Sequence, residues 1–566
     1  MSNLLVPLIT AYATRAKANF IWKTQRMEAV QEQFLLQLLR SHQGTELGQK
    51  FGLSQIRSVD QFRDRIPVLP YSSYEPYTDR IAKGERNILN PDPVVYINLT
   101  SGSTGKKKQV PVTRRFQQTL RKADLAAMGF LSEALQQRGT SFGKSSLTNS
   151  VVLQGRTEGG IEYGPVSVGS IRQGKRLFNQ LMAQPFPALL IADILSRHYV
   201  CLRFALGNRQ TRGMVANFPM LLLRTCQYLE DYAEPLIEDL AQGTIAPWLK
   251  LEPELRSQLN RYCTPQPQRA AELRAILNAC GKLTPQMAWP ELAYTMTARG
   301  GTSDFYFERF PEYFGDLPSF GGVYGSAEAT FGVYPEVNQD SSILAIESGF
   351  YEFMPLTQPS NRPSEYPTTL MPSEVKMGER YRILLTSYSG FYRYDIGDVV
   401  EVVGFYEQTP LIVFRHRLGG LLSSTTEKTT EYHATQVMQA LQQEFNGCLE
   451  DFCITLSEQD FPARYLVNIE ISAGQPQPNL QQLISRFEYW MREFNNPYGT
   501  VRSSQVPAPR LRLLAPGSFA QVRQRQVDRG MFDSQLKFPH ISEDRRFLAG
   551  LPILEEVELA TSVSVS

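Results

Sequence analysis

The chain has 566 residues, of which 42% are hydrophobic and 20% are charged. That length is too great for one hydrophobic core and predicts a large unit together with a smaller one. Its 58 lysines and arginines nearly balance 56 aspartates and glutamates, which leaves a net charge of +2. The balance argues against nucleic acid or an anionic membrane surface as a partner.

The cysteines and histidines show no metal-binding spacing. None of the six cysteines forms a C-x-x-C pair, and the five histidines are scattered, which argues against a zinc cluster. So few cysteines in a long chain fit a reducing compartment, and we expect a cytoplasmic protein. The N-terminus lacks a basic region and Pro7 breaks its apolar run, so we expect no signal peptide. No membrane span is expected, because no run of ~18 apolar residues occurs.

The first predicted elements are a helix and a short strand. Apolar residues from Val30 to Leu39 recur at helical spacing. Prolines then punctuate residues 67–93, and Val94 to Ile97 form a β-branched run that predicts a buried strand. Residues 180–300 read as mainly helical. Within them, the helical pattern of residues 221–240 is expected to break at Pro235.

The pattern changes to strands after residue 301. Strands are predicted at Val323 and over residues 331–333, 343–346 and 350–354, and residues 381–415 are strand-rich again. Five prolines between 355 and 372 predict a long irregular loop.

Leu418-Gly419-Gly420 is the predicted domain boundary, because two successive glycines free the backbone. Beyond it we expect a helix over about 431–445, strands over 451–457 and 465–472, and a helix after the loop 474–478. A strand over 509–514 and a helix from 518 complete the pattern. This alternation predicts a small α/β domain.

The strongest local signal is the loop from Thr100 to Lys108, which reads T-S-G-S-T-G-K-K-K and follows the predicted strand. Glycines let backbone N–H groups converge on an anion, hydroxyls add donors and a lysine supplies countercharge. The loop does not match the Walker pattern G-x-x-x-x-G-K-[ST]. The competing interpretation is a polar turn with a basic flank.

Four weaker signals lie further along the chain. In Y-G-S-A-E, Tyr324 could stack on a purine and Glu328 could hold magnesium, although these residues also suit an ordinary strand end. Asp398 in Y-R-Y-D-I-G-D could accept hydrogen bonds from ribose hydroxyls, or be a solvated turn residue. Arg417 and Lys537, taken alone, read as surface residues. No G-x-S-x-G elbow occurs, which argues against a hydrolase triad.

In this order, the motifs resemble the adenylate-forming superfamily of acyl-CoA synthetases, luciferases and peptide-synthetase adenylation domains. The flanking sequence is similar to one branch, the acyl-acid amido synthetases named after the auxin-responsive Gretchen Hagen genes. This resemblance covers nearly the whole chain. It includes F-R-D-R-I-P ending at Pro67, Y-T-D-R-I-A-K-G ending at Gly84, and Q-L-K-F-P ending at Pro539.

The resemblance implies a role for each matching residue. Glu328 would hold magnesium, and Lys537 would meet the carboxylate and the α-phosphate during adenylation. The residues implied to bind ATP are Ser101, Gly102, Ser103, Thr104, Gly105, Lys108, Tyr324, Asp398 and Arg417. The chain departs from the branch in two places: its phosphate loop is one residue shorter than the plant form, and Leu418-Gly419-Gly420 replaces the usual polar hinge residue.

The resemblance implies an α/β adenylate-forming fold, with an N-terminal adenylation domain over 1–417, a hinge over 418–420 and a mobile C-terminal cap over 421–566. The implied reaction joins a carboxylic acid to an amine, an amino acid for example, using ATP and Mg²⁺. The alternatives are an acyl-CoA or other thioester-forming ligase and a non-catalytic nucleotide-binding scaffold. No fused carrier domain is expected, because the cap fills the residues beyond the hinge.

Overall fold

The computed structural model describes residues 5–100, 108–356, 366–418, 421–425, 427–502, 505–528, 531 and 538–559. The chain divides into two compact units. The first contains Met1–Arg299 and Pro311–Phe414, and the second contains Gly300–Phe310 and Arg415–Ser566. Assignment of Gly300–Phe310 to the second unit was not anticipated from the sequence. The division into an N-terminal domain over 1–417 and a mobile cap over 421–566 stays a prediction. Gly419 and Gly420 of the predicted hinge lie outside the described residues.

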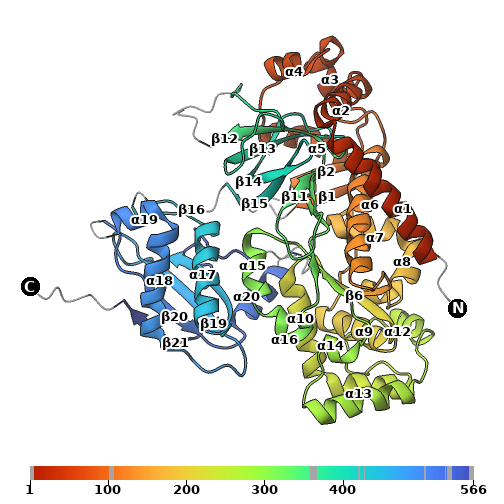
Figure 1. Ribbon diagram of the computed structural model, residues 1–566, viewed down its shortest axis with the longest axis vertical. Coiled ribbons are helices and arrows are strands. Elements are labelled where there is room, and N and C mark those ends of the chain that lie inside the picture. The colour runs from red at the N-terminus through yellow and green to blue at the C-terminus, as the bar shows by residue number, and fades with distance from the viewer. Residues whose placement is uncertain are drawn as a thin grey trace, which may run out of the picture. The chain divides into compact units, whose positions relative to one another are not determined.

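A seven-stranded sheet in the order β12-β13-β14-β15-β11-β10-β9 carries much of the first unit (Figure 1). Its strands are β9 (Val323–Gly325), β10 (Thr330–Val333), β11 (Ser342–Leu344), β12 (Phe350–Pro355), β13 (Arg380–Thr386), β14 (Tyr394–Tyr406) and β15 (Thr409–Arg417). The strand regions predicted after residue 301 are therefore confirmed. Part of the predicted proline-rich loop, residues 357–365, lies outside the described residues.

This sheet is strongly curled, because side chains from strands far apart in its order meet. The Tyr351 hydroxyl on β12 donates to the Thr330 carbonyl on β10. The Tyr324 hydroxyl on β9 donates to Asp398 Oδ2 on β14 at 2.7 Å. Curling brings residues from the two ends of the sheet into one site.

A second sheet of the first unit is parallel, in the order β3-β6-β7-β8. Its strands are β3 (Lys144–Leu147), β6 (Thr211–Val215), β7 (Tyr294–Met296) and β8 (Ser319–Phe320). Residues 180–300 are mainly helical, as predicted, but they also supply β6 and β7. The prediction missed these strands because they are too short and too buried to show alternation.

The helical pattern of residues 221–240 is broken into two helices, as predicted, but the break lies at Tyr232, three residues before Pro235. Helix α10 (Pro219–Asp231) ends before Tyr232, and α11 (Ala233–Gln242) begins after it. Pro235 therefore lies in the first turn of α11. A proline is tolerated there because the first N–H groups of a helix have no intrahelical acceptor.

A third sheet has the order β2-β1-β5-β4, from β1 (Val94–Thr100), β2 (Lys108–Thr113), β4 (Gly155–Arg156) and β5 (Glu162–Gly164). The strand predicted at Val94 to Ile97 is β1, and the predicted N-terminal helix is α2 (Met27–His42). Figure 1 shows α1 (Leu5–Thr24) lying along α6 (Arg114–Gln137). Further helices of this unit include α4 (Val59–Arg65), α5 (Glu75–Ala82), α7 (Val166–Gln173), α9 (Ile194–Leu206), α12 (Pro253–Asn260) and α13 (Pro267–Cys280).

The second unit is built on a sheet in the order β18-β19-β20-β21, and Figure 1 shows α17 and α18 on one face of it. Its main elements are α15 (Asp304–Phe307), α17 (Glu431–Glu444), β18 (Leu449–Leu456), β19 (Tyr465–Ile471), α18 (Leu480–Phe494), β20 (Arg510–Leu514), α20 (Ser518–Asp528) and β21 (Ile553–Glu558). Every helix and strand predicted beyond residue 420 is confirmed. Strand β21 was not predicted.

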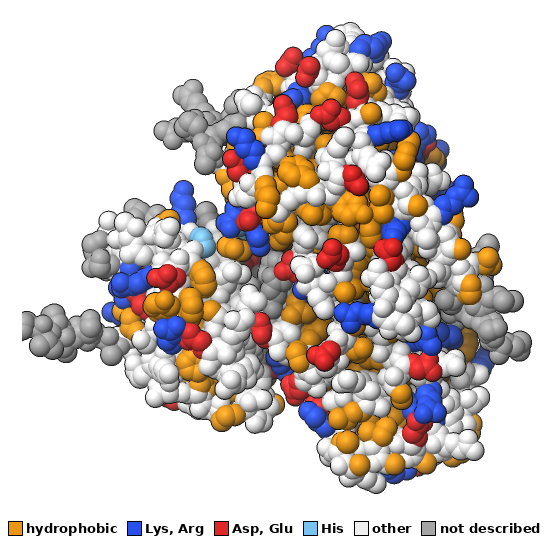
Figure 2. Space-filling model, viewed as in Figure 1, with side chains coloured by type: hydrophobic (Ala, Val, Ile, Leu, Met, Phe, Trp, Pro, Cys, Tyr) orange, Lys and Arg blue, Asp and Glu red, His pale blue; other side chains and the backbone are white. Residues whose placement is uncertain are grey.

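The described surface carries charges of both signs. Figure 2 shows Lys and Arg side chains interspersed with Asp and Glu side chains over the face in view. Among the described residues, no helix has both the length and the hydrophobicity needed to cross a membrane.

Candidate nucleotide-binding and active site

The predicted phosphate loop joins two paired strands. Strands β1 and β2 are antiparallel, and their register pairs Thr100 with Lys108. The two ends of the connection between them, Thr100 and Lys108, therefore lie side by side. Its residues 101–107 lie outside the described part of the chain, and with them the predicted ligands Ser101, Gly102, Ser103, Thr104 and Gly105.

Lys108, the first residue of β2, directs its side chain toward β14. Its Nζ donates to the Tyr394 hydroxyl at 3.1 Å. The same ammonium lies 5.7 Å from the ring centroid of Tyr71 and 5.8 Å from that of Tyr394. Cation–π attraction and the hydrogen bond together fix the position of this charge.

Glu328 lies in the connection between β9 and β10, and its exposed fraction is only 2%. The Ser326 hydroxyl accepts the backbone N–H groups of Glu328 and Ala329, which fixes the turn. The Tyr394 hydroxyl donates to Glu328 Oε1 at 3.3 Å. Among the described residues, no cationic side chain forms an ion pair with this buried carboxylate.

That environment suits a divalent cation. A buried carboxylate is costly unless a cation or hydrogen bonds compensate it. The part of the chain that the structure describes holds no cluster of three or more His, Cys, Asp or Glu residues able to bind a metal. Mg²⁺ in nucleotide sites is held through one or two carboxylates together with substrate phosphates. The surroundings of Glu328 therefore fit its predicted role as a magnesium ligand.

Asp398 lies in an irregular part of β14. Between β13 and β14, Arg382 pairs with Val399 but Leu384 pairs with Asp395, so β14 carries extra residues there. Gly397 within this bulge has φ +82°, a left-handed conformation that glycine adopts without strain. Bulges re-aim side chains next to functional sites. Asp398 is only 1% exposed, so it is not the solvated turn residue of the competing interpretation.

Tyr324 and Asp398 are direct neighbours. Besides the 2.7 Å hydrogen bond to Asp398, the Tyr324 ring stacks on Phe331 at a centroid distance of 5.0 Å. One face of the tyrosine ring is thus taken by the protein. The Tyr324 ring also lies 5.5 Å from that of Phe414, centroid to centroid, and its adenine-stacking role stays a prediction.

Two predicted residues belong to the second unit. Arg417 is the last residue of β15, and its side chain is exposed. Lys537 lies outside the described residues, which resume at Phe538. The Phe538 side chain is buried against Phe519, at a ring-centroid distance of 5.1 Å.

Two buried side chains of the segment Y-R-Y, Arg393 and Tyr394, were not singled out from the sequence. Arg393 is fully buried and binds both oxygens of Glu352 at 3.0 Å, while its Nη1 donates to the carbonyls of Arg63 and Ile66. Tyr394 connects Lys108 with Glu328. The sequence did offer one signal, an arginine between two aromatic residues. Such a flanked arginine indicates burial, and a buried arginine requires partners.

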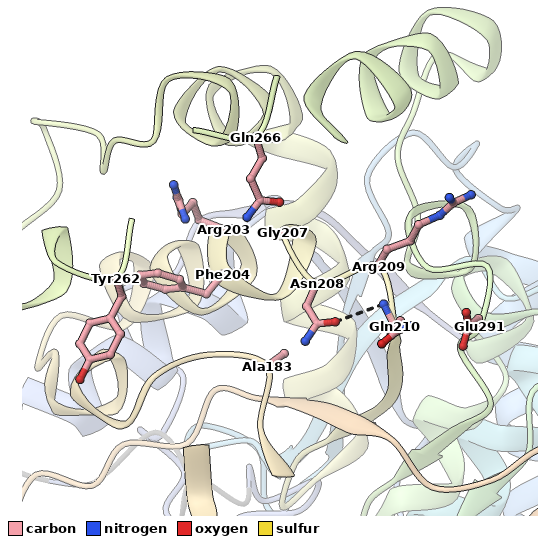
Figure 3. Close-up of a pocket in the computed structure, with 10 residues that line it drawn as sticks. All are labelled: Ala183, Arg203, Phe204, Gly207, Asn208, Arg209, Gln210, Tyr262, Gln266 and Glu291. Carbon is pink, nitrogen blue, oxygen red and sulfur yellow. Dashed lines mark hydrogen bonds between the residues drawn. The ribbon is translucent and has the colours of Figure 1, made fainter. Parts of the chain in front are cut away.

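A cavity of about 630 Å³ in the first unit contains none of the predicted site residues. Figure 3 shows its polar lining, including Asn208 and Gln210, whose hydrogen bond closes the loop before β6. Glu291 precedes β7 and is held by Arg212. The cavity therefore lies at the amino ends of parallel strands, whereas ligands of such sheets bind outside the carboxyl ends.

Comparison with family models gives three consecutive matches. The GH3 family N-terminal domain matches residues 16–319, the central domain matches 342–417 and the C-terminal domain matches 432–546. The first match alone spans more than half of the chain.

Individual proteins are similar over almost the same extent. A jasmonoyl–L-amino acid synthetase of Nicotiana attenuata is 26% identical over 90% of this chain and 90% of its own length. An indole-3-acetic acid-amido synthetase of Oryza sativa subsp. indica is 26% identical over 91% of this chain and 88% of its own length. The solved structure of the GH3.15 acyl acid amido synthetase superposes with a TM-score of 0.84 at 22% identity, covering 97% of this chain and 98% of that one. This structural likeness confirms the predicted α/β fold.

Proposed function

Because this chain belongs to the GH3 family, we propose that it is an ATP-dependent ligase that adenylates a carboxylic acid and transfers the acyl group to an amino acid. The similar curated proteins are named amido synthetases of acids and amino acids. The observation that carries the proposal is the meeting of Lys108, Tyr394 and Glu328, which come from distant parts of the sequence. The proposed magnesium ligand thus lies beside the end of the phosphate loop.

The proposed first step is nucleotidyl transfer. A carboxylate oxygen of the acid attacks the α-phosphorus of ATP, the bond to the β-phosphate oxygen breaks, and pyrophosphate leaves. Lys108 and the loop over 101–107 would hold phosphates, while Tyr324, Asp398 and Arg417 would hold adenine and ribose. Lys537 would meet the carboxylate and the α-phosphate. A Mg²⁺ ion at Glu328 supplies neutralisation of phosphate charge when bound.

In the second step, an amine nitrogen attacks the activated carbonyl carbon. The bond between that carbon and the AMP oxygen breaks, an amide forms, and the nitrogen releases a proton. These residues act chiefly by positioning the reactants and by stabilising developing charge. We propose that the second unit moves between the two steps.

A two-stage assay tests this function. Acids are first screened by Mg²⁺-dependent pyrophosphate release and by trapping the adenylate with hydroxylamine. The best acid is then paired with amino acids and, separately, with CoA, and the product is weighed by mass spectrometry. An amide mass is expected. A thioester mass would identify an acyl-CoA ligase, and no turnover across a broad acid panel would favour a nucleotide-binding scaffold.

Lys537→Ala tests the lysine assigned to the first step. Loss of a charge that stabilises the transition state is expected to lower the adenylation rate by about 10²-fold or more. The affinity for an ATP analogue, measured by calorimetry, should stay within about threefold, which corresponds to less than about 0.7 kcal/mol. Full adenylation by the variant would contradict the assignment of Lys537.

A further inference from the structure

Tyr394 connects Lys108, at the end of the phosphate loop, to the buried carboxylate of Glu328 through two hydrogen bonds, and the donor of each bond can be identified. We propose that Tyr394 is a positioning residue that orients Glu328 for one-oxygen ligation and thereby favours Mg²⁺ over Ca²⁺. The inference rests on the proposed function, because it concerns the metal ion of the same site.

The direction of each bond follows from the donors. An ammonium has three donors and no acceptor, so Lys108 must donate to the Tyr394 oxygen. An ionised carboxylate has only acceptors, so the Tyr394 hydroxyl donates to Glu328 Oε1, 3.3 Å away. A hydrogen bond to a charged acceptor is stronger than one between neutral groups. The Tyr394 hydroxyl therefore accepts from Lys108 and donates to Glu328.

The tyrosine is itself held in place. Its side chain is fully buried, and its ring lies 5.2 Å from that of Phe391 and 6.1 Å from that of Tyr74, centroid to centroid. Leu69 bridges to it through the backbone, and the N–H of Asp395 donates to the Leu69 carbonyl at 3.0 Å. A phenol so constrained loses little entropy on bonding, and it holds Glu328 Oε1 in one direction.

This arrangement leaves the second oxygen of Glu328 for the metal. Among the described residues, no hydrogen bond or ion pair reaches Oε2, while Oε1 accepts from Tyr394. Ca²⁺ accepts six to eight oxygens, often from a bidentate carboxylate, whereas Mg²⁺ requires near-ideal octahedral geometry. A carboxylate that offers one oxygen matches the smaller ion.

The test compares two single hydroxyl deletions in neighbouring residues. Tyr394→Phe removes the bridge. Tyr392→Phe is the matched control, because Tyr392 is equally buried but its hydroxyl lies 3.0 Å from His42 Nδ1. Mn²⁺, standing in for Mg²⁺, is titrated in the presence of α,β-methylene ATP and its free concentration is followed by electron paramagnetic resonance. Competition by Ca²⁺ is measured in the same assay.

Tyr394→Phe is expected to weaken Mn²⁺ binding about 10-fold, as for loss of a charge-assisted hydrogen bond, and to increase competition by Ca²⁺. Tyr392→Phe should leave both unchanged. Equal Mn²⁺ and Ca²⁺ behaviour in the two variants would overturn the inference. If wild type binds the metal with the analogue as expected but releases no pyrophosphate with any acid, the proposed function fails and the positioning role of Tyr394 survives.

A second variant keeps the inference testable if Tyr394→Phe does not fold. Lys108→Met removes a donor that helps to hold the Tyr394 oxygen in place beside Glu328, and should weaken Mn²⁺ binding by about threefold or more. When both variants fold, their effects should be less than additive in the double variant, since each breaks the same connection. Strict additivity would show that Lys108 acts on the metal site without Tyr394.

Discussion

Arg393 ties the site-forming end of β14 to the lead-in segment of the first unit. Its guanidinium binds Glu352 through two 3.0 Å contacts, and both side chains are 1% exposed. Arg393→Lys keeps the charge but loses the planar fork, so part of the buried carboxylate is left unpaired. We expect a loss of about 3 kcal/mol in the free energy of unfolding, measured with urea. Arg80, exposed and also bound to carboxylates, is the control, and Arg80→Lys should change stability little. Equal midpoints for the two variants would contradict a stabilising role for Arg393.

His42 makes the stability of the first unit depend on pH. The side chain is 1% exposed, and burial, aided by the charge of Arg115, lowers the pKa of His42 to about 4. Below the ordinary pKa of 6.5, the unfolded chain takes up a proton that native His42 does not accept until about pH 4. Stability from this group is therefore complete above pH 6.5 and falls as the pH drops toward 4, by ~3 kcal/mol in all. Urea unfolding at pH 7.5, 5.5 and 4.5 should show a smaller decline in His42→Gln than in wild type. Parallel declines in the two proteins would exclude His42 as a source of the pH dependence of stability.

At the scale of elements, the bulge in β14 is what aims Asp398. Gly397→Ala places a side chain at φ +82° and strains the bulge. We expect about a 10-fold loss of affinity for α,β-methylene ATP, by calorimetry, because Asp398 is displaced. Gly404→Ala is the control in the same strand, since its new Cβ would lie an ordinary 3.7 Å from Leu411 Cδ1. If both variants bind the analogue as wild type does, either the bulge tolerates the alanine or Asp398 is not a nucleotide ligand.

The elements that could be predicted from sequence are those with a helical period or a short, continuous apolar run. Helix α17 was located to within a few residues because its buried positions recur at helical spacing. Strands β18 and β19 are buried along almost their whole length and were located as short, largely apolar runs. Strand β21 was missed because nearly all its side chains are exposed, so it shows no alternation. The site was predicted as a set of separate motifs. The contact between Lys108 and Tyr394 joins residues 286 positions apart that lie on two different sheets, and no local pattern encodes such a contact.

At the scale of the whole molecule, a short segment from the middle of the chain completes the second unit. The backbone passes between the units at residues 299–300, 310–311 and 414–415. Within the second unit, Phe305 packs on Phe452 with a centroid distance of 5.1 Å, and Tyr306 donates to Asp451 Oδ1 at 3.2 Å. A movement of the second unit therefore has to bend the chain at three places, not only at the predicted glycine hinge.

The contribution of this segment can be measured by separating it from the rest of its unit. A chain of residues 415–566 alone uncovers Phe452 and the buried carboxylate of Asp451, whose contacts with Arg523 at 2.6 Å and with His540 remain. We expect it to bind a hydrophobic dye and to unfold at lower temperature than the same chain with residues 300–310 fused through a flexible linker. A linker-fused segment carrying Phe305→Ala and Tyr306→Ala is the control and should not restore stability, because loss of two buried aromatic side chains costs several kcal/mol, about 3–5 for each. If the fragment 415–566 is as stable alone as with the wild-type segment, residues 300–310 do not contribute to the stability of the second unit. The second unit could then move by bending the chain at the glycines alone.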